Sequence, residues 1–198
     1  MKKLNPLSII ILLILIPLGV YWIGFMKNRP SPTRPAITKM AQVNSRQITE
    51  KPSSDGTVKL IETSQKDDGG SKYVFTVTNV KTGINTTILE TIVDQSTSFI
   101  IPDNAWSPDN KQFFLEKVSP AERVYLVFKA DGTDYSNGQK FLDVNSYWSK
   151  TKYNLSIRTI TGWGSHDLLV VYTLKEDGSN GASFWFVTGS RNFLQLSQ

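Results

Sequence analysis

The sequence predicts an all-β fold, and two observations carry this prediction. From Asp55 onward, short runs of β-branched and aromatic residues alternate with turn residues such as Asp131-Gly132 and Asp177-Gly178, which is typical of antiparallel strands joined by tight hairpins. No stretch of this region shows the helical spacing of apolar residues. We predict eleven strands, at residues 57–63, 72–80, 85–92, 98–102, 111–118, 123–130, 140–144, 155–162, 168–174, 183–189 and 192–196.

The predicted strands fall into repeats. Trp106 precedes a turn and two strands, and 57 residues later Trp163 precedes another turn and two strands. A less clear copy begins at Asp55-Gly56. Each copy supplies only a few antiparallel strands and is too small to bury its faces alone, so we expect about three such units to stack on one another.

One copy carries a recognisable turn motif. Its residues are Trp106, Ser107, Pro108, Asp109, Asn110 and Lys111. Together with the strand that closes in Asp131-Gly132, this segment resembles the repeat of TolB-like β-propellers, a WD40-like propeller repeat. The resemblance implies a four-stranded blade in which the Ser-Pro-Asp turn joins the first two strands. Asn110 stands where that repeat usually has Gly, and Asn tolerates the left-handed backbone of such a turn. The copy at Trp163 keeps the aromatic residue but lacks Ser-Pro.

The predicted fold class is therefore all-β, with propeller-like antiparallel blades. Closed propellers have about four to eight blades, whereas this chain has strands for about three. Three arrangements remain open. They are a partial propeller, a β-sandwich, and a six-bladed ring that a second copy of the chain completes as a homodimer.

The N-terminal segment, residues 1–26, is predicted to be a transmembrane helix that anchors the protein. No charged residue occurs between Lys3 and Lys27, and at about 1.5 Å per residue this stretch can cross the roughly 30 Å hydrocarbon core of a bilayer. A cleaved signal peptide is the alternative, but the stretch is longer than the usual apolar region and does not end in small residues. We expect a single-pass plasma-membrane protein whose β domain lies outside the cytoplasm.

Residues 27–54 are predicted to be a proline-rich linker, and residues 55–198 the β domain. Pro30, Pro32 and Pro35 favour extended backbone, and the polar residues around them leave no apolar period to bury. A segment of this kind acts as a spacer that holds a domain away from a membrane.

Charge and cysteine content exclude several classes of function. The net charge is +5 at pH 7, but residues 1–39 contain six basic and no acidic residues, so the remainder has a net charge of −1. A nucleic-acid surface would need its basic residues on the folded domain, so we expect no nucleic-acid partner. The chain has no cysteine, which excludes a disulfide, a thiolate metal site and the lipid-modified cysteine of a lipoprotein.

The sequence contains no motif that predicts catalysis. It lacks both the Gly-x-Ser-x-Gly turn of hydrolases and a phosphate-binding Gly-Lys-Ser/Thr loop. Ser165 and His166 are adjacent in the chain, and we expect adjacent side chains on a turn to point apart rather than to form a nucleophile and base pair. We therefore predict no catalytic residue, no metal site and no cofactor.

Most of the aromatic residues are expected to pack in the core, and one pair is the exception. Tyr147 and Trp148 lie in a polar stretch, residues 145–153, where an exposed aromatic pair is a candidate ligand platform. We therefore predict a membrane-anchored cell-envelope protein whose β domain binds another protein or a cell-wall polymer without catalysis. The alternatives are an accessory propeller that gates or recruits a separately encoded hydrolase, and a structural part of a surface assembly.

Overall fold

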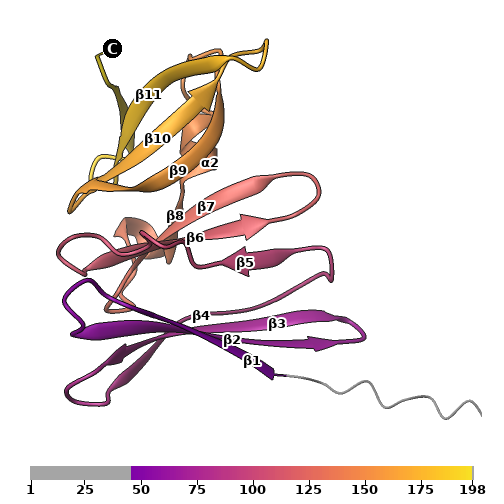
Figure 1. Cartoon of the computed structure of the whole chain (residues 1–198), viewed down its shortest axis with the longest axis vertical. Helices are drawn as coiled ribbons and strands as arrows, with labels where there is room; N and C mark the ends of the chain where they lie inside the picture. Colours follow the sequence, from indigo (N-terminus) through magenta and orange to yellow (C-terminus); the bar gives the residue numbers. More distant parts are fainter. Residues whose placement is uncertain (1–45, 198) are drawn as a thin grey trace, which may run out of the picture. The chain divides into compact units, whose positions relative to one another are not determined.

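The computed structural model describes residues 46–197, which form three antiparallel sheets of four strands each (Figure 1). The first sheet consists of β1 (Arg46–Pro52), β2 (Val58–Asp67), β3 (Gly70–Asn79) and β4 (Asn85–Val93). The second consists of β5 (Ser98–Ile100), β6 (Gln112–Val118), β7 (Arg123–Lys129) and β8 (Phe141–Asp143). The third consists of β9 (Ser156–Ser165), β10 (Leu168–Leu174), β11 (Asn180–Val187) and β12 (Asn192–Gln195). Within each sheet, the strands lie side by side in chain order.

Two short helices lie between strands, one between β7 and β8 and one between the second and third sheets. The 3-10 turn η1 spans Ser136–Gly138, and the helix α2 spans Val144–Trp148 directly after β8. The Asp143 side chain caps α2 by accepting a hydrogen bond from the Ser146 backbone N–H, as expected of an N-cap aspartate.

The same serine turn opens the second strand of the first sheet and of the second sheet. In the second sheet, Ser107 Oγ donates to Asp109 Oδ1 at 2.8 Å and accepts from the Gln112 backbone N–H at 3.0 Å. In the first sheet, Ser53 Oγ donates to Asp55 Oδ1 at 2.8 Å. Asn110 has a φ of 56°, which confirms the left-handed turn predicted for it.

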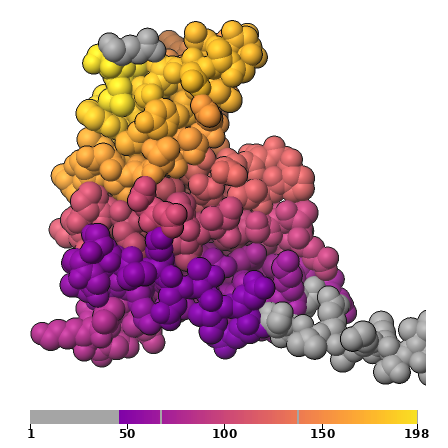
Figure 2. Space-filling view, viewed as in Figure 1, coloured from indigo at the N-terminus to yellow at the C-terminus, as the bar shows by residue number. Residues whose placement is uncertain are grey.

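The first two sheets pack face to face over one hydrophobic core. Its fully buried members are Leu60, Phe75, Phe113, Leu115 and Phe128. A second core lies between the second and third sheets, and its fully buried members include Phe114, Val127, Leu169, Val171, Phe184 and Phe186. Because neighbouring side chains of a strand point to opposite faces, β6 contributes Phe113 to one core and Phe114 to the other. Figure 2 shows the three sheets as successive bands of colour.

A tryptophan links each sheet to the one before it. Trp106 Nε1 donates to the Lys51 carbonyl in the first sheet at 3.1 Å, and Trp163 Nε1 donates to the Ala105 carbonyl in the second unit at 2.8 Å. Both donors lie at the edge of a core, where an indole can bury its ring and still pair its N–H. The repeated tryptophans therefore hold consecutive sheets in register.

The structure confirms the all-β prediction and corrects one boundary. Each of the eleven predicted strands overlaps one of β2 to β12, whereas β1 lies within residues 27–54, which the sequence analysis assigns to the linker. Between Arg46 and Pro52 that assignment is wrong, because these residues pair with β2 along their whole length. The three sheets do not close into a ring within residues 46–197.

The predicted transmembrane anchor and most of the predicted linker lie outside the described residues. Within residues 46–197, no helix has the length and hydropathy needed to cross a bilayer. The prediction for residues 1–26 therefore stays a prediction.

Candidate functional site

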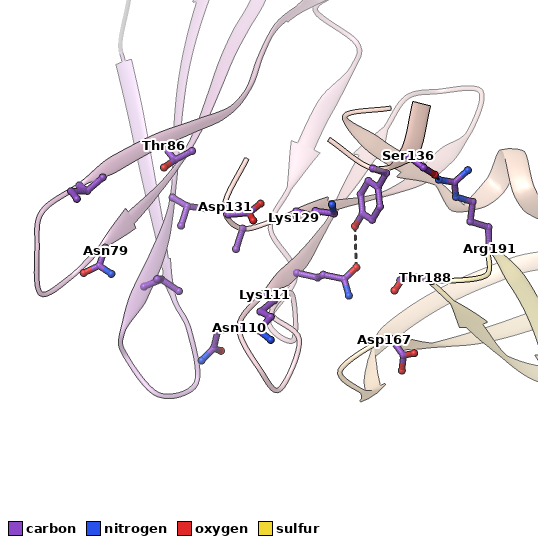
Figure 3. Close-up of a pocket in the computed structure, with 17 residues that line it drawn as sticks. Asn79, Thr86, Asn110, Lys111, Lys129, Asp131, Ser136, Asp167, Thr188 and Arg191 are labelled. Carbon is purple, nitrogen blue, oxygen red and sulfur yellow. Dashed lines mark hydrogen bonds between the residues drawn. The ribbon is translucent and has the colours of Figure 1, made fainter. Parts of the chain in front are cut away.

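A pocket of about 760 Å³ opens where equivalent ends of the three sheets meet (Figure 3). The first sheet contributes Val58, Val77, Asn79, Ile84 and Thr86. The second contributes Asn110, Lys111, Gln112, Lys129, Ala130, Asp131, Tyr135 and Ser136, and the third contributes Asp167, Thr188, Gly189 and Arg191. In Figure 3 the labelled side chains come from three separate parts of the ribbon toward one space.

The repeated architecture explains why these residues meet. In each sheet, one backbone hydrogen bond joins the start of the second strand to the end of the third. These bonds run from Val80 N–H to Thr57 O (2.9 Å), from Ala130 N–H to Lys111 O (2.8 Å) and from Thr188 N–H to Asp167 O (2.9 Å). Stacking three such sheets places the three strand ends at one side of the domain, and the pocket forms there.

Tyr135 and Gln112 form the centre of the pocket wall. Tyr135 Oη donates to Gln112 Oε1 at 3.0 Å, and Gln112 Nε2 donates to the His166 carbonyl at 3.1 Å. Lys129 Nζ lies 5.2 Å from the centre of the Tyr135 ring, a cation–π distance. Burial raises the pKa of Tyr135 above its ordinary value, so this phenol is a neutral hydrogen-bonding group and not a base.

Three cations and two carboxylates surround the pocket. Lys129 Nζ donates to the Asp134 carbonyl at 2.8 Å, and Arg191 Nη2 donates to Ser136 Oγ. Lys111 Nζ lies 3.9 Å from Asp109, and the Lys111 side chain is 81% exposed, so its ammonium group has room for another anionic partner. The carboxylates are Asp131 and Asp167.

The pocket combines these charges with apolar surface. Val58, Val77, Ile84 and Ala130 line the side formed by the first and second sheets. Ile84 is 65% exposed on the hairpin between β3 and β4. An exposed isoleucine next to a pocket provides apolar area that a ligand can cover.

The two predicted ligand-binding aromatics lie away from this pocket. Trp148 is 7% exposed and belongs to the core between the second and third sheets, with its Nε1 donating to the Leu155 carbonyl at 2.8 Å. The prediction of an exposed pair is wrong for Trp148, because residues 144–148 form the helix α2, which turns this side chain inward. Tyr147 is half-buried, stacks on Phe186 with ring centres 5.8 Å apart, and lines a different hollow of about 510 Å³.

The residues of the predicted turn motif have separate roles. Ser107 is fully buried and Trp106 is 9% exposed, so both are structural. Pro108 and Trp163 line a third hollow together with Trp106. Asp109 accepts the Ser107 hydrogen bond, and Asn110 lines the main pocket.

Ser165 and His166 do not point apart as expected. Ser165 Oγ lies 3.1 Å from His166 Nδ1, and His166 Nε2 lies 3.7 Å from Asp167 Oδ1. Ser165 ends β9, His166 and Asp167 form the tight turn before β10, and the His166 side chain is 67% exposed to water. This exposure leaves the group without the water-excluded surroundings that activate a nucleophile.

The pocket residues that the sequence analysis missed carry no motif. Tyr135, Lys129 and Arg191 lie in loops or at strand ends of two different sheets. The only sequence signal that bears on them is the repeat itself, because it predicts that equivalent strand ends lie on one side. Within residues 46–197, no group of three or more His, Cys, Asp or Glu side chains is placed to hold a metal ion.

No protein-family model matches this chain, and neither a curated protein nor a solved structure matches it. The resemblance to TolB-like β-propellers therefore stays a prediction that rests on Trp106 to Lys111 and on the repeats.

Proposed function

We propose that the protein is a non-catalytic binding module of the cell envelope, anchored by residues 1–26, and that the pocket shared by the three sheets binds its ligand. We further propose that the ligand is a peptide segment of another envelope protein, with an apolar side chain next to a carboxylate. The observation that carries this proposal is the lining of the pocket, where apolar residues and cations from all three sheets face one space of about 760 Å³.

The size and chemistry of the pocket favour a short segment of a chain as the ligand. Ligand pockets usually have volumes of roughly 300 to 1,000 Å³, and this one lies within that range. The apolar surface around Val58, Val77 and Ile84 suits an aliphatic or aromatic side chain. Lys111, with its exposed ammonium group, suits a carboxylate through a charge-assisted hydrogen bond.

The polar groups of the pocket favour binding over catalysis. Tyr135 and Gln112 already pair with each other, and Gln112 also donates to the His166 carbonyl. Ser136 Oγ pairs with Arg191, a cation that cannot act as a general base. A reaction would need a nucleophile next to a base, and the lining residues supply no such pair.

We also propose that the three sheets are blades of a TolB-like propeller that this chain alone does not close. Each sheet is a four-stranded antiparallel meander, and the sheets stack face to face. The serine turn at Ser107 to Asn110 stands at the start of the second strand of its sheet, where the resemblance places it. The envelope location rests on the uncharged N-terminal stretch and the proline-rich segment after it.

A pocket-filling variant tests the proposed site. A Cβ atom added at Gly189 would meet no atom within 4 Å, so this position has room for a side chain, and we expect Gly189→Phe to occupy part of the pocket that Gly189 lines. A random peptide library displayed on phage is panned on the full chain in detergent. We expect enriched peptides to carry an apolar residue beside Asp or Glu. Their affinity, measured by fluorescence polarisation, should fall at least about tenfold for Gly189→Phe, which corresponds to about 1.4 kcal/mol, and also for Lys111→Glu.

The matched control is Gln65→Phe, which places the same aromatic ring on an exposed position of β2 far from the pocket end of that strand. Its affinity for the peptides should equal that of the unchanged protein. Peptides that bind Gly189→Phe as well as the unchanged protein, or a library that yields no pocket-dependent peptide, would contradict the proposal.

A further inference from the structure

The pocket adjoins a second hollow at Arg191. This arginine lines the pocket of about 760 Å³, and it also lines the hollow of about 510 Å³ at Tyr147. In Figure 3, Arg191 lies at the side of the pocket opposite Asn79. The loop before Arg191 divides in the same way, because Gly189 lines the pocket and Ser190 lines the hollow. The two spaces are therefore neighbours that share one long cationic side chain.

Arg191 has a backbone conformation that an arginine rarely adopts. Its φ is 61°, in the left-handed region that favours glycine. Counted from Val80 and Thr188, which make equivalent backbone hydrogen bonds, Arg191 corresponds to Gly83 of the first sheet. In both hairpins this residue donates its N–H to the carbonyl four residues earlier, at 2.8 Å from Gly83 and 2.7 Å from Arg191. The φ of Gly83 is 70°, so the third sheet has arginine where the first has the residue that suits this backbone.

The guanidinium of Arg191 has no acidic partner within residues 46–197. The side chain is half-buried, and none of the ion pairs in this part of the chain includes it. It donates to Ser136 Oγ, whereas a guanidinium carries five N–H donors in a planar fork. Strained backbone at a residue other than glycine is common where the side chain has a function. A carboxylate can receive two parallel hydrogen bonds from such a fork.

Aromatic rings and a second cation line the hollow beyond Arg191. The rings are Tyr147, Tyr153 and Phe193, and Tyr153 is 42% exposed. Lys150 Nζ lies 5.0 Å from the centre of the Tyr147 ring and belongs to none of the ion pairs within residues 46–197. An aromatic side chain can pack edge to face against such rings. The two cations attract an acidic ligand rather than a basic one.

We propose that the peptide ligand of the pocket crosses Arg191, binds it through a carboxylate, and places an aromatic side chain in the hollow at Tyr147. This inference rests on the proposed function of the pocket and adds a second subsite to it. An extended chain advances about 3.3 Å per residue, so the acidic residue lies within about three residues of both anchors. The ligand is thus an acidic segment with an apolar side chain on one side and an aromatic side chain on the other.

Replacing Arg191 by Gly separates ligand binding from folding. Glycine removes the guanidinium but suits the left-handed backbone, so the thermal unfolding midpoint of the full chain in detergent should rise by about 2 to 4 °C. The affinity for the phage-selected peptides, labelled with fluorescein, should fall at least about tenfold. Arg191→Lys keeps the charge but loses the planar fork, and it should weaken binding at least about threefold without raising the midpoint.

The matched control is Arg46→Gly. It removes an exposed arginine at the start of β1, at the end of the first sheet away from the pocket, where Arg46 pairs with Gln65. The affinity for the peptides should stay unchanged, and the unfolding midpoint should not rise.

A bulky side chain at Ser190 tests the second subsite. Ser190 is exposed and lines the hollow, so the indole of Ser190→Trp should compete with the aromatic side chain of the peptide. We expect affinity for the selected peptides to fall at least about fivefold. Peptides in which that aromatic residue is replaced by Ala should bind Ser190→Trp and the unchanged protein equally well.

Failure of this inference and failure of the proposed function give different results. Peptides that Gly189→Phe blocks, but that bind Arg191→Gly and Ser190→Trp as tightly as the unchanged protein, would refute the second subsite and support the pocket alone. A lower unfolding midpoint for Arg191→Gly would show that Arg191 serves the fold through its bond to Ser136, and would overturn the inference. A library without any pocket-dependent peptide would contradict both.

Discussion

Replacing Glu62 by Gln is expected to stabilise the domain at neutral and alkaline pH but not in acid. Glu62 lies in β2, is 8% exposed, and shares its face of the first sheet with Leu60 and Tyr73. Burial raises the pKa of Glu62 from its usual 4.5 to about 7. Burial raises the pKa of Tyr73, and the negative charge of Glu62 raises it further, so the two groups are close enough to interact. A buried carboxylate of this kind destabilises the folded state once it ionises.

The sign and the size of the effect follow from the pKa. Well below pH 4.5 the carboxyl is protonated in both the folded and the unfolded chain, so it does not lower the free energy of unfolding. Between pH 4.5 and pH 7 the unfolded chain ionises first and stability falls, and above pH 7 the full cost is present. At about 1.36 kcal/mol per pKa unit, a rise from 4.5 to about 7 corresponds to at most about 3.4 kcal/mol. Water that reaches part of the carboxyl screens its charge, so we expect about half of this, ~1.5 to 2 kcal/mol.

Urea unfolding at pH 4.5, 6 and 8 measures this effect. The free energy of unfolding of Glu62→Gln should match that of the unchanged protein at pH 4.5 and exceed it by the stated amount at pH 8. The matched control is Glu90→Gln, which removes an exposed carboxylate paired with Lys72 on the outer face of the same sheet and should change stability little at any pH. A Glu62→Gln difference that is independent of pH, or a loss of stability at pH 8, would refute the reasoning.

Three further substitutions test the packing of the sheets. Trp163→Phe removes the hydrogen bond to the Ala105 carbonyl and should lower the free energy of unfolding by about 1 to 2 kcal/mol; an unchanged urea midpoint would contradict the linking role of this tryptophan. Tyr125→Phe removes a buried hydroxyl that has no partner within residues 46–197 and should raise the free energy of unfolding by about 1 kcal/mol, which calorimetry can measure. Trp148→Ala should lower it by about 3 to 5 kcal/mol, and a loss below 1 kcal/mol would mean that Trp148 is not part of the core.

The strands could be predicted because their local signals agree with the final structure. Short runs of β-branched and aromatic residues between turn residues mark β2 to β12 in the sequence. The strand β1 was missed because nearly all of its residues are exposed, so no apolar alternation distinguishes it from the preceding linker. The β2 strand determines its conformation by pairing with it, which is a tertiary effect that the local sequence does not carry.

The site was harder to predict than the fold. The sequence predicts a turn at Asn110 but not a place for it in a pocket. Asn110 lines the pocket because the stacking of the sheets brings its turn next to β2 and to the loop at Arg191. Trp148 was misread because the polar residues around it suggested a loop, although the Asp143 cap starts a helix there. Pocket residues such as Tyr135 come together only through the packing of the second sheet on the third, which no single motif encodes.

The order of the strands also bears on how the chain folds during synthesis. Every sheet consists of four strands that follow one another in the sequence, so each can form as soon as its own segment has left the ribosome, with little loop-closure entropy to overcome. The completed first sheet would then expose the apolar surface around Leu60 and Phe75 until β6 and β7 arrive to cover it. Each finished sheet thus acts as the template on which the next one assembles, and the stack grows from the N-terminal side.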